Sequence, residues 1–122
     1  MQHLSDTATF ASVVNEYFGS DQEYAMFQWA MLLNPEAGAV VQATGGARKV
    51  RWFDVPRGVG TRGGLRVIYF YRHEDEALIF VAVYRKTEKR DLTPTDKRIL
   101  REMSAELQSQ FEAKRAKKER QR

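Results

Sequence analysis

The sequence predicts a small α+β protein, with N-terminal helices and a C-terminal helix packed on a small antiparallel sheet. Apolar residues recur with helical spacing before residue 34 and after residue 93, whereas the intervening stretch 49–84 has the period of two that is typical of strands. The length of 122 residues suits one domain. We therefore expect one domain over residues 1–122, with a frayed basic tail at about 114–122.

Two helices are predicted at the N-terminal end. The first is indicated by an apolar stripe at helical spacing, made of Phe10, Val13, Val14, Tyr17 and Phe18. Gly19 ends this helix because glycine tolerates a positive φ. The run Ser20-Asp21-Gln22-Glu23 is typical of a capping box, so a second helix is predicted over about 21–33, ending at Asn34-Pro35.

Three strands and a last helix follow. Residues 49–52 alternate between basic and apolar side chains, and two strongly β-prone runs cover residues 65–72 and 77–84 with a polar turn between them. Thr93-Pro94-Thr95-Asp96 has the features of a helix start. The buried stripe of this last helix is then predicted to be Leu100, Met103, Leu107 and Phe111.

Composition excludes several kinds of chemistry. The chain has no Cys, which rules out disulfides, a thiol nucleophile and cysteine metal sites. Its two histidines, His3 and His73, are too few for a metal site built mainly on imidazole, so we expect no metal and no cofactor. No apolar run is long enough to span a membrane, and the first residues lack a secretory signal. We therefore expect a cytoplasmic protein with no membrane partner.

Charge is distributed unevenly along the chain. Residues 1–46 contain no Lys or Arg and carry a formal charge of −5, whereas residues 47–90 carry +6 and residues 91–122 carry +3. Most of the bases in the middle segment are Arg, whose planar fork of donors matches phosphate oxygens. Such a segment indicates a nucleic-acid backbone as partner, although a solvated basic face without a partner fits equally well.

The basic residues of this segment suggest a phosphodiester site. On a sheet, Lys49, Arg51 and Arg66 would converge on one face, and Lys86 and Lys89 would follow at its edge. Such a cluster stabilises the charge that develops during cleavage, and a lysine crowded by cations can act as a general base. With RNA the nucleophile is the substrate's own 2′-hydroxyl. Tyr84 would stack on a base or exchange a proton.

Three stretches resemble the RelE/HigB toxins of bacterial type II toxin–antitoxin systems. They run from Gly45 to Trp52, from Gly63 to Tyr71 and from Tyr84 to Thr93, and the stretch from Tyr24 to Gly38 is similar to the HigB-like branch. The resemblance implies a RelE-like α+β fold and a metal-independent endoribonuclease that cuts mRNA in the ribosomal A site. It also implies a cognate antitoxin, often with a helix-turn-helix, as partner.

The resemblance further implies roles for individual residues. Lys49 and Arg51 match the basic pair on the family's strand, Arg66 its phosphate-contacting arginine, and Lys86, with Lys89 nearby, the base after the last strand. The catalytic set is then Lys49, Arg66, Tyr84, Lys86 and Lys89, and the RNA-binding set is Arg48, Arg51, Arg62, Arg85 and Arg90. The family's tyrosine after the last strand has no counterpart beyond Tyr84, so the proton-transfer roles stay open.

A second hypothesis remains from a different class of function. The related ParE-like toxins inhibit DNA gyrase without catalytic residues, and a basic module with no chemistry is also consistent with the composition. The dense bases at 48–51 and 85–90 favour the nuclease. Whether the antitoxin covers the basic site or blocks ribosome docking from a distance is not determined by the sequence.

Overall fold

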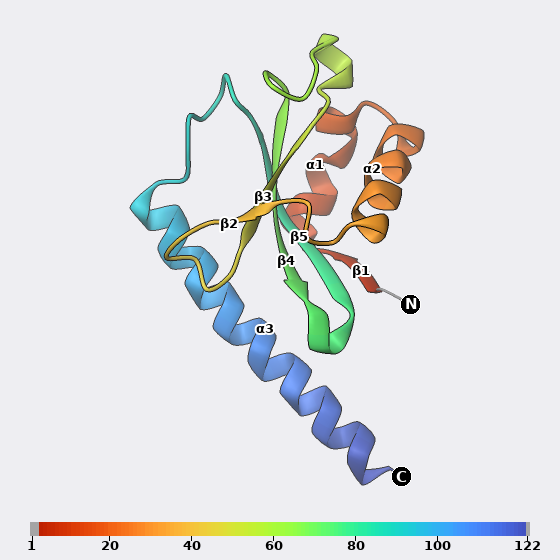
Figure 1. Ribbon diagram of the computed structural model, residues 1–122, viewed down its shortest axis with the longest axis vertical. Helices are drawn as coiled ribbons and strands as arrows, with labels where there is room; N and C mark the ends of the chain where they lie inside the picture. Colours follow the sequence, from red (N-terminus) through yellow and green to blue (C-terminus); the bar gives the residue numbers. More distant parts are fainter. Residues whose placement is uncertain (1–2, 122) are drawn as a thin grey trace.

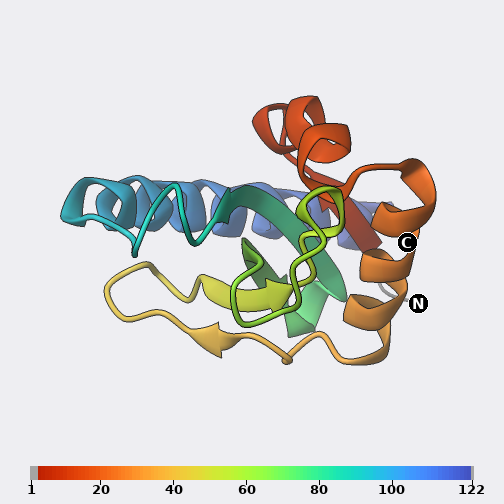
Figure 2. The same ribbon diagram turned by 90° about the horizontal axis from the view of Figure 1, so that it is seen from above.

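The computed structural model describes residues 3–121 and shows five strands and three long helices within them. The sheet has the order β1-β5-β4-β3-β2; β1 pairs with β5 in parallel and every other pair is antiparallel. Figures 1 and 2 show α1 and α2 on one side of the sheet and α3 along the other. The elements are β1 His3–Asp6, α1 Ala8–Phe18, α2 Asp21–Leu33, β2 Ala39–Val40, β3 Arg48–Trp52, β4 Leu65–Arg72, β5 Ala77–Arg85 and α3 Pro94–Arg120.

The predicted α+β class is confirmed, and so are the main elements. The helix starts lie where the capping residues indicated: the Thr93 hydroxyl accepts from the Asp96 amide, and the Asp96 carboxylate accepts from the Thr93 amide. Gly19 ends α1 with a φ of 93°. Two short edge strands, β1 and β2, were not predicted, because β1 forms by pairing with the distant strand β5 and β2 has only two residues.

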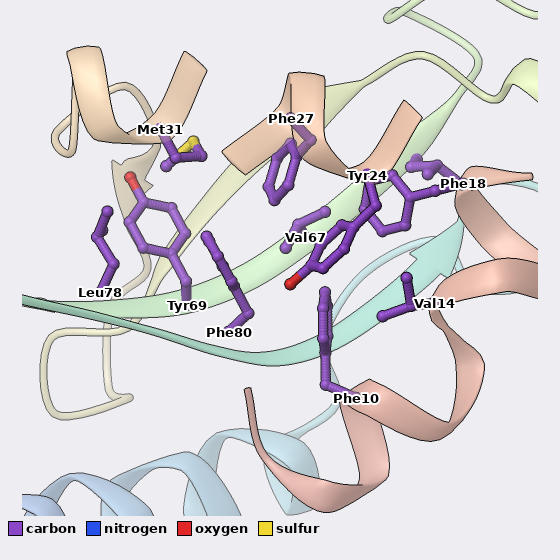
Figure 3. Close-up of a cluster of buried hydrophobic side chains, with 11 residues drawn as sticks. Phe10, Val14, Phe18, Tyr24, Phe27, Met31, Val67, Tyr69, Leu78 and Phe80 are labelled. Atoms are coloured by element: carbon purple, nitrogen blue, oxygen red, sulfur yellow. The ribbon is translucent and has the colours of Figure 1, made fainter. Parts of the chain in front are cut away.

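The face of the sheet toward α1 and α2 holds the larger core. Eleven buried residues gather there, and seven of them are aromatic or methionine. Figure 3 shows Tyr24, Phe27 and Met31 pointing from α2 toward Val67, Tyr69 and Phe80 of the sheet. The buried residues are Phe10, Val14, Phe18, Tyr24, Phe27, Met31, Leu65, Val67, Tyr69, Leu78 and Phe80.

The face toward α3 holds a smaller core. It combines Ile68, Phe70 and neighbouring strand residues with Leu100 of α3, while Met103, Leu107 and Phe111 pack against it only partly buried. The predicted stripe of α3 is therefore correct. At the C-terminal ends of β3 and β5 this face carries polar and basic side chains instead of apolar ones. Arg51, Arg66 and Tyr84 lie opposite one another there.

The C-terminal end differs from the expectation of a frayed tail. Helix α3 continues to Arg120 and extends beyond the sheet (Figure 1). Residues 114–120 are mostly Lys, Arg, Ala and Glu, which favour helices, and Arg115 bonds Glu74 at 3.1 Å and Asp75 at 3.4 Å in the β4–β5 turn. Arg122 lies outside the described residues. Between residues 3 and 121, no helix is both long and apolar enough to cross a membrane.

Candidate nucleic-acid site

The register of the sheet brings predicted site residues from three strands into one row. Arg51 of β3 lies opposite Arg66 of β4, and Arg66 lies opposite Tyr84 of β5. Lys49, two residues before Arg51, therefore points to the same face. The predicted convergence of Lys49, Arg51 and Arg66 is confirmed, and the row faces the same side of the sheet as α3.

Arg66 is the most buried member of this row. Only 7% of its surface is exposed, and its guanidinium donates to the carbonyl oxygens of Thr61 (3.1 Å), Arg62 (2.8 Å) and Leu65 (3.1 Å). Burial, and secondly the positive charge of Arg51, lower the pKa of Arg66. The arginine thus fixes the loop before β4 and keeps its charge without a carboxylate partner among the described residues.

Arg51 lies directly beside this buried charge. Its side chain is exposed, and within residues 3–121 it makes no hydrogen bond or ion pair. Like charges directly opposite each other on neighbouring strands destabilise a sheet. An anion bound between Arg51 and Arg66 would relieve this repulsion, so the pair forms a site suited to a phosphate.

Two carboxylates missed by the sequence analysis pair with predicted catalytic lysines. Asp91 lies 3.4 Å from the Lys49 amine, and Asp96 lies 2.5 Å from the Lys89 amine. A bond from the Leu92 amide is the main cause that lowers the pKa of Asp91, and the bond from Lys89 is the main cause for Asp96. The run around Thr93 indicated a helix start, but nothing local could reveal the contact between residues 49 and 91.

Tyr84 is buried, with 8% of its surface exposed. Its hydroxyl has no hydrogen-bond partner among the described residues, and burial raises its pKa, with the charge of Asp91 as the second cause. Together with Lys89, Leu92 and Asp96 it lines a cavity of about 240 Å³ beside the start of α3. A buried ring cannot stack on an exposed base as predicted, but a hydroxyl that keeps its proton can donate one.

Two predicted RNA-binding residues lie on the other face of the sheet. Arg48 donates to the carbonyl oxygens of Gly38 (2.8 Å) and Glu36 (3.4 Å). Arg85 bonds the buried carboxylate of Asp54 at 2.9 Å and lies over the ring of Tyr17. Residues an odd number of positions apart on a strand point to opposite faces, so Arg48 and Arg85 lie apart from Arg51, and their role in RNA binding stays a prediction.

The remaining predicted residues lie on loops around the row. Arg62 precedes β4, and Lys86 and Arg90 follow β5; all three side chains are exposed. The two loops meet where the Lys86 amide donates to the Gly64 carbonyl oxygen at 3.3 Å. Between residues 3 and 121, no group of three or more His, Asp or Glu side chains is placed to hold a metal ion.

The fold and the site together define a small α+β protein with a cationic site at one end of its sheet. A sequence model of the RelE toxin of the RelE/RelB toxin–antitoxin system matches residues 40–121, which is more than half of the chain. The protein belongs to this family and is a toxin of a toxin–antitoxin system. The likeness to the HigB-like branch at residues 24–38 lies outside the match and stays a prediction.

Proposed function

We propose that this toxin is an endoribonuclease that cuts mRNA in the ribosomal A site and needs no metal ion. The 2′-hydroxyl of the substrate is the nucleophile. The observation that carries the proposal is the Arg51–Arg66 pair, two arginines directly opposite each other on neighbouring strands with no carboxylate bonded to either within residues 3–121. A phosphodiester supplies the charge that this pair lacks.

Cleavage begins when the scissile phosphate of the mRNA is bound by Arg51 and Arg66. The 2′-oxygen attacks the adjacent phosphorus in line, its proton passes to a base, and the bond to the 5′-oxygen breaks as that oxygen gains a proton. The products are a 2′,3′-cyclic phosphate and a 5′-hydroxyl. Arg51 and Arg66 stabilise the negative charge that develops on the phosphoryl oxygens.

The protein offers candidates for both proton transfers. Lys49 shares the sheet face with the arginines, and Lys86 and Lys89 stand on the loop after β5; one of these lysines is the general base. Tyr84 is assigned to the acid side of the reaction, because it lies opposite Arg66 in the sheet and lines the cavity that Lys89 and Asp96 border. Phosphate must compete with Asp91 for Lys49, so this lysine is compensated in the absence of substrate, whereas the two arginines are not compensated by any described carboxylate.

Cleavage of ribosome-bound mRNA tests this proposal directly. Purified toxin should cut a programmed mRNA in the A site, and a 2′-deoxy substitution at the cut position should abolish the cut while leaving binding intact. Arg51→Ala should cut about 100-fold more slowly, the loss typical for one charge-stabilising donor. Arg51→Lys is the matched control, because it keeps the charge without the fork of donors and should lose less.

Pulse labelling separates this function from gyrase inhibition. The nuclease stops incorporation of labelled amino acids within minutes of expression, before incorporation of thymidine changes. If DNA synthesis stops first and mRNA remains whole, the protein acts on gyrase and the nuclease proposal is wrong. The same labelling should be done with Lys86→Ala and Arg66→Ala. Cells that express either variant should continue to incorporate labelled amino acids.

A further inference from the structure

Helix α2 presents an unpartnered apolar stripe to solvent. Met26, Trp29 and Leu33 are 60%, 65% and 80% exposed, and their spacing of three and four residues puts them on one side of the helix. The opposite side of α2 is anchored in the core by Tyr24, Phe27 and Met31 (Figure 3). These three large side chains contribute nothing to the core of the fold. An exposed apolar patch of this kind marks a contact surface.

Acidic groups flank this stripe at both ends. Asp21 begins α2, Glu36 follows it, and both are exposed. A helix of this length is about 20 Å long, and Asp21 at its start and Glu36 beyond its end lie on either side of the apolar residues along the chain. Residues 1–46 contain no Lys or Arg, and the nearby Arg48 is held by the carbonyl oxygens of Gly38 and Glu36.

This charge pattern selects the kind of partner. The α2 stripe and its flanking acids would repel a phosphate backbone, whereas the Arg51–Arg66 pair on the other face attracts one. The charge pattern therefore disfavours contact of the α2 side with ribosomal RNA or mRNA. A protein segment with apolar residues between two cationic ones fits it, because the apolar residues cover Trp29 and the cations meet Asp21 and Glu36.

We propose that the antitoxin docks an apolar segment flanked by Lys or Arg on the α2 stripe, away from the basic site. The inference uses the family membership, which supplies an antitoxin as partner, and it holds whether or not the toxin cuts RNA. The family match begins at residue 40, so the stripe lies on the part of the chain that the family model does not describe. The basic site stays open in the complex, and neutralisation follows from the bulk of the antitoxin.

Binding of the antitoxin to toxin variants tests the location. The antitoxin is the protein whose co-expression restores growth to cells that make this toxin. Trp29→Ser should weaken its binding about 30-fold, as expected for an aromatic residue at the centre of an interface, and Trp29→Phe should recover most of the affinity. The double variant Asp21→Lys, Glu36→Lys should also bind more weakly, and wild-type affinity should fall as salt rises.

Arg51→Ala is the matched variant on the opposite face. It should bind the antitoxin with wild-type affinity, and the wild-type complex should still bind a short 2′-deoxy analogue of the mRNA as tightly as free toxin does. Thermal unfolding of Trp29→Ser should equal that of the wild type, which excludes misfolding. RNA cleavage by Trp29→Ser should also be unchanged, so the result does not depend on the proposed nuclease.

Three results would overturn the proposal. One is wild-type affinity of the antitoxin for Trp29→Ser. The second is loss of antitoxin binding in Arg51→Ala, or loss of RNA binding in the complex, because the antitoxin would then cover the basic site. The third is a dimer of the free toxin that Trp29→Ser dissolves, which would assign the stripe to a second copy of the chain.

Discussion

The two faces of the sheet differ in the size of their apolar core and in whether their arginines have partners. On the α1/α2 face, aromatic side chains fill the core and each arginine is compensated: Arg85 by Asp54, and Arg48 by backbone carbonyl oxygens. On the α3 face the apolar cover ends early, and Arg51 stands beside Arg66 without a carboxylate partner among the described residues. Stability is concentrated on the first face, and the candidate chemistry lies on the second.

The difference shows how an alternating strand can separate these roles. Arg48 and Arg51 lie on one strand three positions apart, and this odd separation turns their side chains to opposite faces. Arg48 is bonded to backbone carbonyl oxygens of the fold, whereas Arg51 is bonded to no described residue and is a cation that is free to bind a partner. The like-charge pair is tolerated because the larger core on the other face stabilises the fold.

The largest effect should come from breaking the larger core. Phe27 is fully buried among Phe18, Trp52 and Phe80, so Phe27→Ala should lower the free energy of unfolding by about 3–5 kcal/mol. Phe111→Ala, on the partly buried side of the smaller core, should lose less than half of that. Denaturant titration of both variants measures the difference, and equal losses would contradict the contrast between the two cores.

The second comparison uses Arg48 and Arg51. Arg51→Ala should cut RNA about 100-fold more slowly without lowering the free energy of unfolding, because its exposed side chain makes no bond within residues 3–121 and its removal relieves the repulsion of Arg66. Arg48→Ala should cut RNA normally but unfold about 1 kcal/mol more easily, because the Gly38 carbonyl oxygen loses its donor. Cleavage assays and chemical denaturation on the same preparations check both. Equal loss of cleavage would mean that the alternation does not separate the roles.

Alkaline pH should loosen the contact between α1 and the loop after β5. The Tyr17 hydroxyl donates to Glu88 at 2.9 Å, and burial, followed by this bond, raises the pKa of Tyr17 from 10.0 to about 12. The folded state therefore holds the proton more tightly than the unfolded state. Its stabilising effect is complete below pH 10 and is lost as the pH rises to about 12.

Tyr17→Phe isolates this effect. Because the variant lacks the hydroxyl, the difference in free energy of unfolding between it and the wild type should be constant up to about pH 10 and should shrink between pH 10 and 12. Urea titrations across this range measure it. A difference that stays constant to pH 12 would show that the Glu88 contact is absent in solution.

The smallest effect should come from the start of α3. Thr93→Ala removes the hydroxyl that accepts from the Asp96 amide at 3.1 Å, so the free energy of unfolding should fall by about 1 kcal/mol. Asp96, which bonds Lys89, should then be held less firmly, and cleavage should change only slightly. Thr93→Ser retains the hydroxyl and should behave as the wild type. A large loss of cleavage in Thr93→Ala would place the start of α3 in the site itself.

Local physics in the sequence was enough for the main elements. Helix caps such as Thr93 and Ser20, and the shift from helical to alternating periodicity, act over a few residues, so they can be recognised without a structure. The same reasoning put Lys49, Arg51 and Arg66 on one face, because a period of two needs only the correct strand. It failed for the helical end of α3, where Arg115 reaches Glu74 across the fold.

Only the tertiary structure decided which cations stay open. Asp54 neutralises Arg85 across 31 positions, and Asp91 pairs with Lys49 across 42. Such partners are brought together by the register of distant strands and by the path of loops, which leave no periodic signal in the chain. The sequence by itself determined where charge is concentrated and which elements carry it. The folding of those elements determined which of those charges are left to bind a partner, because compensation depends on distance in space.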